Sequence, residues 1–134
     1  MPTVLVVDDE PLMRDLMELT LADRPDLRVR CTSTGAAALE VARSERVALV
    51  LLDGGLPDMD GFALCARLRR DPTLHRLLIV MVTGRAGSAE QQQARQLGAD
   101  AYLVKPFSPS GLLELVGSLL PVAPAPASAA VLVA

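Results

Sequence analysis

Three short apolar runs, each rich in β-branched residues, limit what this chain can fold into. They cover residues 4–7, 47–52 and 77–82. Strands that are apolar on both sides are typical of parallel sheets covered by helices on both faces. Two weaker runs, 27–31 and 101–104, look only half buried, so we expect them to be edge strands.

Helical patterns occupy the segments between these runs. Apolar residues recur at helical spacing at Leu12, Leu16 and Leu19 and again at Phe62, Cys65 and Leu68. Each set marks the apolar stripe of one helix, the side that normally faces a core. Two further helices are expected, at 35–44 and at about 109–119.

Capping residues indicate where the helices begin and end. Pro11 suits a first helical turn, Ser108-Pro109 opens another helix, and Gly98 marks a stop. The sequence from Ser88 to Gln91 matches a capping box, which predicts that the serine caps the helix that follows it.

The alternation of strands and helices predicts the architecture. With right-handed crossovers it gives an α/β fold, a doubly wound five-stranded parallel sheet with helices on both faces. Placing the two weakest strands at the edges gives the order 2-1-3-4-5 of flavodoxin-like folds. In that order the chain changes direction between the first and third strands, so the crevice at their carboxyl ends is the expected ligand site.

The composition changes once along the chain, after Leu120. Residues 1–120 carry the strand and helix patterns, and 134 residues are too few for two ordinary domains. Residues 121–134 alternate Pro and Ala before an apolar end, which favours an extended tail or linker. We therefore expect one folded domain, 1–120, and a separate tail, 121–134.

The overall charge and the cysteines argue against several classes of function. A net charge of −3 and a pI near 5.1 argue against nucleic-acid binding by this chain alone and against docking on anionic membranes. Cys31 and Cys65 supply no disulfide framework, and the sequence has no secretory signal pattern and no apolar run of membrane-spanning length. We expect a cytoplasmic protein.

Three carboxylates are predicted to meet at the crevice. Asp8 and Asp9 follow the first strand, and Asp53 follows the apolar run of the third. Like charges this close would raise their own pKa values unless a cation neutralised them, and a hard oxygen cluster suits Mg²⁺. Acidic residues at strand ends also serve as helix caps, and Asp9-Glu10 could fill that role for the first helix. The two roles are compatible.

Two more polar side chains are predicted at the same edge of the sheet. Thr83 ends the fourth strand and Lys105 ends the fifth, just before Pro106. A lone lysine there is usually only solvated, and a lone threonine in a strand usually reflects β-propensity. Their coincidence with the three aspartates favours a functional site.

The motifs at these strand ends resemble those of response-regulator receiver domains, the phosphoacceptor domains of two-component signalling typified by chemotaxis regulators. They read Val6-Val7-Asp8-Asp9-Glu10-Pro11, Leu51-Leu52-Asp53 with Pro57 and Asp60-Gly61, Val82-Thr83-Gly84, and Gly98-Ala-Asp-Ala-Tyr102-Leu-Val-Lys105-Pro106-Phe107. The resemblance spans residues 3–119, with the motifs in family order and at family spacing.

This resemblance implies a role for each site residue. Asp53 would be the nucleophile that takes a phosphoryl group from the phosphohistidine of a histidine kinase. Asp9, Asp53 and the main-chain carbonyl of Gly55 would coordinate Mg²⁺, and Asp8 would act mainly through a bound water. Lys105 would pair with a phosphoryl oxygen, and the hydroxyl of Thr83 would turn toward another.

The resemblance also implies how the signal leaves the site. Tyr102 occupies the family's switch-aromatic position, although it could equally be an edge-strand tyrosine half covered by a helix. Movement of Thr83 and Tyr102 would change the face made by helix 88–97, the fifth strand and helix 109–119. The implied partners are a sensor histidine kinase or phosphotransfer protein and a downstream protein or output domain. A phosphorylation-dependent dimer is left open.

The loop after Asp53 departs from the commonest family pattern. Gly54 and Gly55 replace bulkier apolar residues, Asp58 follows Pro57, and Gly84 and Arg85 follow Thr83. The rigidity of the loop and the phosphoryl lifetime are therefore open. An aspartyl-phosphate hydrolase is one rival, but such enzymes carry a second aspartate where this chain has Gly55. A degenerate receiver that only binds partners is another. The chain is expected to be a switch and not an enzyme with an external substrate.

Overall fold

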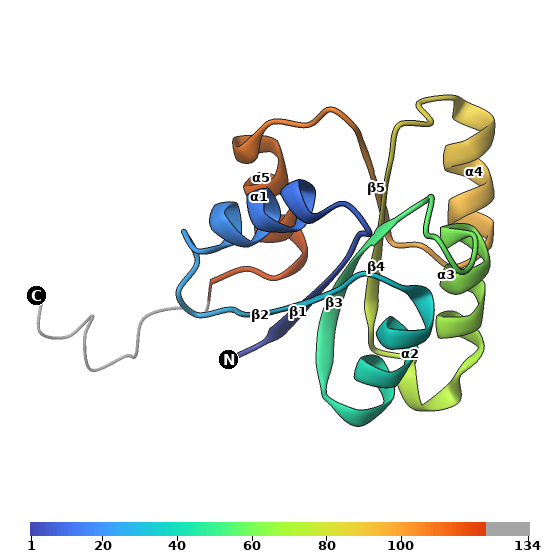
Figure 1. Ribbon diagram of the computed structural model, residues 1–134, viewed down its shortest axis with the longest axis horizontal. Helices are drawn as coiled ribbons and strands as arrows, with labels where there is room; N and C mark the ends of the chain where they lie inside the picture. Colours follow the sequence, from blue (N-terminus) through green and yellow to red (C-terminus); the bar gives the residue numbers. More distant parts are fainter. Residues whose placement is uncertain (123–134) are drawn as a thin grey trace, which may run out of the picture.

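A five-stranded parallel sheet forms the centre of the computed structural model, which describes residues 1–122 (Figure 1). The strand order is β2-β1-β3-β4-β5, as predicted, so the predicted fold class is confirmed. The division into 1–120 and 121–134 stays a prediction, and the predicted tail beyond residue 122 lies outside the described residues. Within 1–122, no helix is both long and apolar enough to span a membrane.

The strands lie within one residue of their predicted ends. They are β1 (Thr3–Val7), β2 (Arg28–Thr32), β3 (Val47–Asp53), β4 (Leu78–Thr83) and β5 (Ala101–Val104). β1 is buried along its whole length, and β3 and β4 are buried along most of theirs, which explains their unbroken apolar sequences. β2 and β5 form the two edges and are more exposed.

Helices cover both faces of the sheet. They are α1 (Pro11–Leu21), α2 (Gly35–Ser44), α3 (Gly61–Arg70), the 3-10 turn η1 (Pro72–Leu74), α4 (Ser88–Gln96) and α5 (Pro109–Leu119). Figure 1 shows α1 and α5 together on one face and α2, α3 and α4 on the other. Two aliphatic clusters result, one on each side of the sheet.

Most predicted helix ends are correct. Ser108 accepts a hydrogen bond from the backbone N–H of Gly111 at 3.0 Å, and Gly98 ends the α4 segment with a φ of 104°. The predicted capping box at α4 is wrong. Ser88 is already helical there, because Gly87 takes the extended cap position and offers no side chain.

The predicted apolar stripe of α1 faces away from the core. Leu12 and Leu19 are 77% and 75% exposed, whereas Met17 and Leu21 are fully buried. α1 carries two apolar stripes at helical spacing, and only one of them can face the sheet. The corresponding stripe of α3 is buried as predicted.

Candidate functional site

The acidic cluster lies at the carboxyl edge of β1 and β3. Asp8 and Asp9 follow the last residue of β1, and Asp53 is the last residue of β3. Since β1 and β3 are hydrogen-bonded neighbours, their ends meet. Carboxylate oxygens of Asp8, Asp9 and Asp53 lie within 4.8 Å of one another.

Lys105 joins the two buried members of this cluster. Asp8 and Asp53 are only 1% and 9% exposed, whereas Asp9 is exposed. The Lys105 ammonium donates to Asp8 Oδ2 at 3.1 Å and to Asp53 Oδ1 at 3.2 Å. Asp8 Oδ1 also accepts the backbone N–H of Glu10 at 2.9 Å, so both oxygens of Asp8 are engaged. Lys105 is the only lysine in the sequence.

Burial and like charge leave the cluster with uncompensated negative charge. Burial, followed by the charge of Asp8, raises the pKa of Asp53 by more than Lys105 and the Gly55 amide lower it. Burial lowers the pKa of Lys105, but its hydrogen bonds and ion pairs with Asp8 and Asp53 raise it by more. Lys105 is therefore firmly cationic, and its single ammonium contacts two of the three carboxylates.

The residues present fit a hard divalent cation. Three carboxylates converge from two strand ends, and exposed Asp9 leaves one side open to water. Mg²⁺ prefers oxygen ligands and usually keeps several waters, so a small, partly open set of carboxylates suits it. Both oxygens of Asp8 already accept hydrogen bonds, and Asp53 Oδ1 accepts one from Lys105, so exposed Asp9 is the carboxylate most open to a cation.

Thr83 lies beside the nucleophile candidate, on the neighbouring strand. It ends β4, is 6% exposed, and its hydroxyl accepts the backbone N–H of Arg85 at 3.3 Å. A Cβ added at Gly54 would lie 2.9 Å from Thr83 Oγ1. Gly54 therefore lets Thr83 approach the end of β3, a role that the sequence did not indicate.

Tyr102 is tied to the loop that follows Thr83. Its hydroxyl donates to the backbone carbonyl of Arg85 at 2.6 Å, and its ring is half buried against the core. The guanidinium of Arg85 lies over the Phe62 ring, 5.6 Å from its centroid. Both interpretations of Tyr102, switch residue and half-covered edge tyrosine, remain compatible with this arrangement.

Two residues near the site make contacts that the sequence did not indicate. The Arg14 guanidinium donates to the main-chain carbonyl of Asp8 at 2.7 Å and so holds the β1–α1 turn. Asp58, in the loop after Asp53, accepts backbone N–H groups from the start of α2. The Asp58 contact joins segments 23 and 22 residues apart, and the Arg14 contact depends on the path of the turn between β1 and α1.

The family can now be assigned. The profile of the family described as response regulator receiver domain matches residues 4–117. The chain belongs to this family. It is a receiver domain of the kind found in two-component response regulators, and receiver domains act as phosphoacceptor switches.

Individual proteins support the assignment. Over 118 residues the receiver domain is 40% identical to the transcriptional regulatory protein GltR of Pseudomonas aeruginosa. This match covers 88% of this chain and 48% of GltR. Among solved structures, chemotaxis protein CheY4 of Vibrio cholerae matches with a TM-score of 0.83 and 31% identity, covering 90% of this chain and 99% of CheY4. A BeF3-activated DrrB receiver domain matches with a TM-score of 0.79 and 28% identity, covering 90% and 97%. The chain thus spans about half the length of the curated relatives it matches.

Proposed function

We propose that Asp53 accepts a phosphoryl group from the phosphohistidine of a sensor histidine kinase or phosphotransfer protein. The supporting observation is a buried Asp53 carboxylate at the carboxyl edge of the sheet, bonded to Lys105 and clustered with two further aspartates. One carboxylate oxygen of Asp53 attacks phosphorus, the phosphorus–nitrogen bond of the donor breaks, and the imidazole leaves with that electron pair.

Each neighbouring residue has a part in this transfer. Asp9, Asp53 and the Gly55 carbonyl would hold Mg²⁺, which when bound offsets charge on the phosphoryl oxygens. Asp8 would contribute through a water. Lys105, already between Asp8 and Asp53, shifts its ammonium toward a phosphoryl oxygen when negative charge arrives.

The phosphoryl group would also be read by Thr83 and Tyr102. The Thr83 hydroxyl, now bonded only weakly to the Arg85 amide at 3.3 Å, turns toward a phosphoryl oxygen. Because Tyr102 bonds the carbonyl of the same Arg85, movement of this loop reaches β5 and the adjacent helices α4 and α5. A ligand can shift such an equilibrium only by preferring one state.

The same proposal implies the partner proteins of this switch. Its upstream partner is a kinase or phosphotransfer protein, and its downstream partner is a protein or an output domain that reads α4, β5 and α5. The chain acts on no external substrate beyond its own phosphorylation and dephosphorylation. Cytoplasmic location, absence of nucleic-acid and membrane binding by this chain alone, and a phosphorylation-dependent dimer all stay predictions.

Phosphodonor labelling tests the proposal. The protein is incubated with acetyl phosphate and Mg²⁺, followed by intact-mass measurement and borohydride trapping of the acyl phosphate. One phosphoryl group mapped to Asp53 is expected, and omission of Mg²⁺ should prevent labelling. Catalytic release of phosphate from an added phosphate monoester would instead indicate a hydrolase, and no labelling with any donor would indicate a degenerate receiver.

The switch is tested separately by NMR. Beryllium fluoride with Mg²⁺ stands in for the phosphoryl group, and amide shifts are compared along the chain. Residues 84–107 should shift far more than residues 12–43. Equal shifts in the two regions would contradict the proposed route, even if Asp53 is phosphorylated.

A further inference from the structure

The loop between β3 and α3 is fastened to a helix from another part of the chain. Asp58 accepts the backbone N–H of Gly35 at 2.8 Å through Oδ1 and that of Ala36 at 3.0 Å through Oδ2. The next N–H of α2, that of Ala37, is accepted by the Thr34 hydroxyl at 3.1 Å. Asp58 therefore completes the N-terminal cap of α2 and places its charge at the positive end of the helix.

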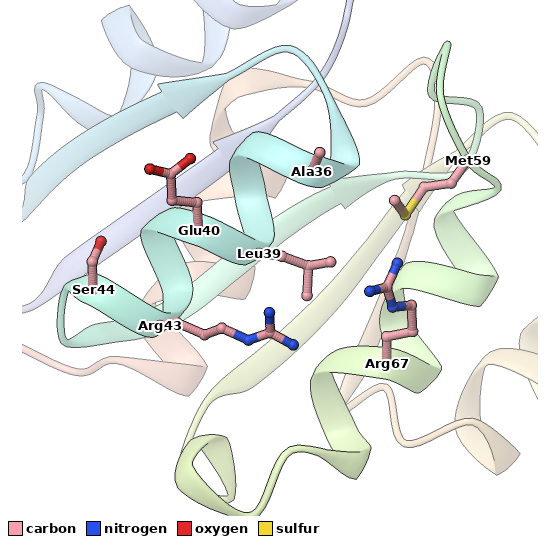
Figure 2. Close-up of a pocket in the computed structure, with 7 residues that line it drawn as sticks. All are labelled: Ala36, Leu39, Glu40, Arg43, Ser44, Met59 and Arg67. Carbon is pink, nitrogen blue, oxygen red and sulfur yellow. The ribbon is translucent and has the colours of Figure 1, made fainter.

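Met59 adds an apolar contact to the same attachment. A Cβ at Gly35 would lie 2.6 Å from Met59 Cγ and Sδ, so the Met59 side chain packs directly on Gly35 and would have to shift if a larger residue stood there. Figure 2 shows Met59 extending from the loop toward Ala36 and Leu39 of α2, where it lines a pocket between α2 and α3. Two successive side chains thus hold the loop tip against α2.

At its other end, the loop is held next to the nucleophile candidate. The N–H of Gly54 bonds the Val82 carbonyl at 3.2 Å, and the N–H of Gly61 bonds the Gly54 carbonyl at 3.0 Å. An isolated antiparallel bridge joins Gly55 to Asp60. Gly55 is exposed, and a Cβ added there would meet no atom within 4 Å, so side-chain packing does not restrict it. Two successive glycines also give the backbone wide conformational freedom.

We infer that Asp58 is a positioning residue for the cation site, because its attachment to α2 restricts the backbone that carries the Gly55 carbonyl. The inference rests on the proposed function, in which that carbonyl is a Mg²⁺ ligand. Asp58 touches neither the cation nor the phosphoryl group. Its charge satisfies two N–H groups of α2, and this fixes the loop tip three residues beyond Gly55. The anchor thus offsets the freedom of the Gly54-Gly55 pair.

The test compares Asp58→Ala and Asp58→Asn with Asp71→Ala. Asp71 is a matched control, since it also caps a turn, accepting the Thr73 N–H at 2.9 Å, but lies outside this loop. Mg²⁺ affinity is measured by titration calorimetry, and amide hydrogen exchange is followed at residues 54–60. Loss of a residue that orients a metal ligand typically lowers affinity by about tenfold or more.

We expect Asp58→Ala to bind Mg²⁺ about tenfold more weakly and to exchange faster at residues 54–60, with Asp58→Asn intermediate and Asp71→Ala near wild type. Labelling by acetyl phosphate should recover at saturating Mg²⁺. Unchanged affinity in both Asp58 variants, or an equal loss in Asp71→Ala, would overturn the inference. If Asp58→Ala does not fold, Asp58→Asn decides it. Absence of Mg²⁺ binding in the wild type would instead count against the proposed function itself.

Discussion

Charged groups are held in different ways at the two ends of the parallel strands, here called the carboxyl edge and the amino edge of the sheet. At the carboxyl edge, Asp8 and Asp53 are almost completely buried and share the single ammonium of Lys105, with Asp9 close by. At the amino edge, Arg69 and Asp100 form a partly exposed pair at 2.8 Å. Charge is in excess at the first edge and balanced at the second.

At the amino edge, further hydrogen bonds satisfy both members of the ion pair. Arg69 also donates to the Gly98 carbonyl at 3.0 Å, and Asp100 accepts the Ile79 N–H at 2.8 Å, so the pair connects α3, β4 and the turn before β5. Buried charge without compensation costs free energy, which a cation bound at the carboxyl edge can recover. We therefore expect the carboxyl edge to determine ligand binding and the amino edge to determine stability.

The largest difference should appear in phosphorylation. Asp53→Asn keeps the shape of the side chain and an acceptor for Lys105 but lacks the anionic nucleophile, so labelling should fall to background. Asp100→Asn, at the balanced edge, should be labelled at close to the wild-type rate. Intact mass after incubation with acetyl phosphate measures both. Wild-type labelling of the Asp53→Asn variant would refute the assignment of Asp53.

The next largest effect concerns cation binding. Asp9→Ala removes a carboxylate ligand, and Mg²⁺ affinity should fall by at least about tenfold, equivalent to about 1.4 kcal/mol. Asp23→Ala, which removes an exposed aspartate after α1, should leave the affinity unchanged. Titration calorimetry at constant ionic strength provides the measurement. Equal affinities for the Asp9→Ala variant and the wild type would exclude Asp9 as a ligand.

At the balanced edge the effect should be on stability. Arg69→Ala removes a partly exposed ion pair and the hydrogen bond to Gly98, and the free energy of unfolding should fall by about 1–2 kcal/mol. Phosphorylation should remain intact, because none of these contacts reaches the acidic cluster. Urea unfolding, monitored by circular dichroism, measures the change. A loss of labelling without loss of stability would contradict this division of roles.

The sequence was sufficient to predict the fold and to group the three aspartates of the candidate site. Unbroken apolar strands, strand-end polar residues and right-handed crossovers determine which strand ends meet, so Asp8, Asp9 and Asp53 could be grouped without coordinates. The stripe of α1 could not be oriented in this way, since Leu12 and Met17 both satisfy helical spacing and only packing selects between them.

Contacts between distant segments were also beyond prediction. The pairing of Asp58 with α2 joins residues 23 and 22 positions apart, and no local pattern encodes it. Similarly, the sequence suggested only flexibility at Gly54, and the structure adds that this glycine gives Thr83 room to approach. Sequence patterns describe single helices, strands and loops, whereas these roles depend on how two of them pack together.

The smallest expected effect is a gain in stability of the metal-free protein when Asp53→Asn removes one negative charge from the carboxyl edge. Burial and the charge of Asp8 raise the pKa of Asp53, so the folded state binds that proton more tightly than the unfolded chain does. The wild type should therefore lose stability as the pH rises from the ordinary carboxyl value of 3.8 through the raised pKa. Asp53→Asn does not titrate there, and it should be more stable near neutral pH by roughly 0.2–1 kcal/mol, the usual size of a like-charge pair.

Magnesium should make the wild type more stable than the Asp53→Asn variant. This reversal tests whether a cation compensates the excess charge. A cation that binds only the folded wild type stabilises it by mass action, whereas the Asp53→Asn variant, lacking one ligand charge, should gain much less. Thermal unfolding with EDTA and with excess Mg²⁺ gives both comparisons on the same samples. Asp100→Asn, which weakens the Arg69 pair, should be less stable than wild type under both conditions. If Asp53→Asn is instead the less stable protein in EDTA, the Asp53 charge is already compensated by Lys105, and the carboxyl edge holds no excess charge for a cation to offset.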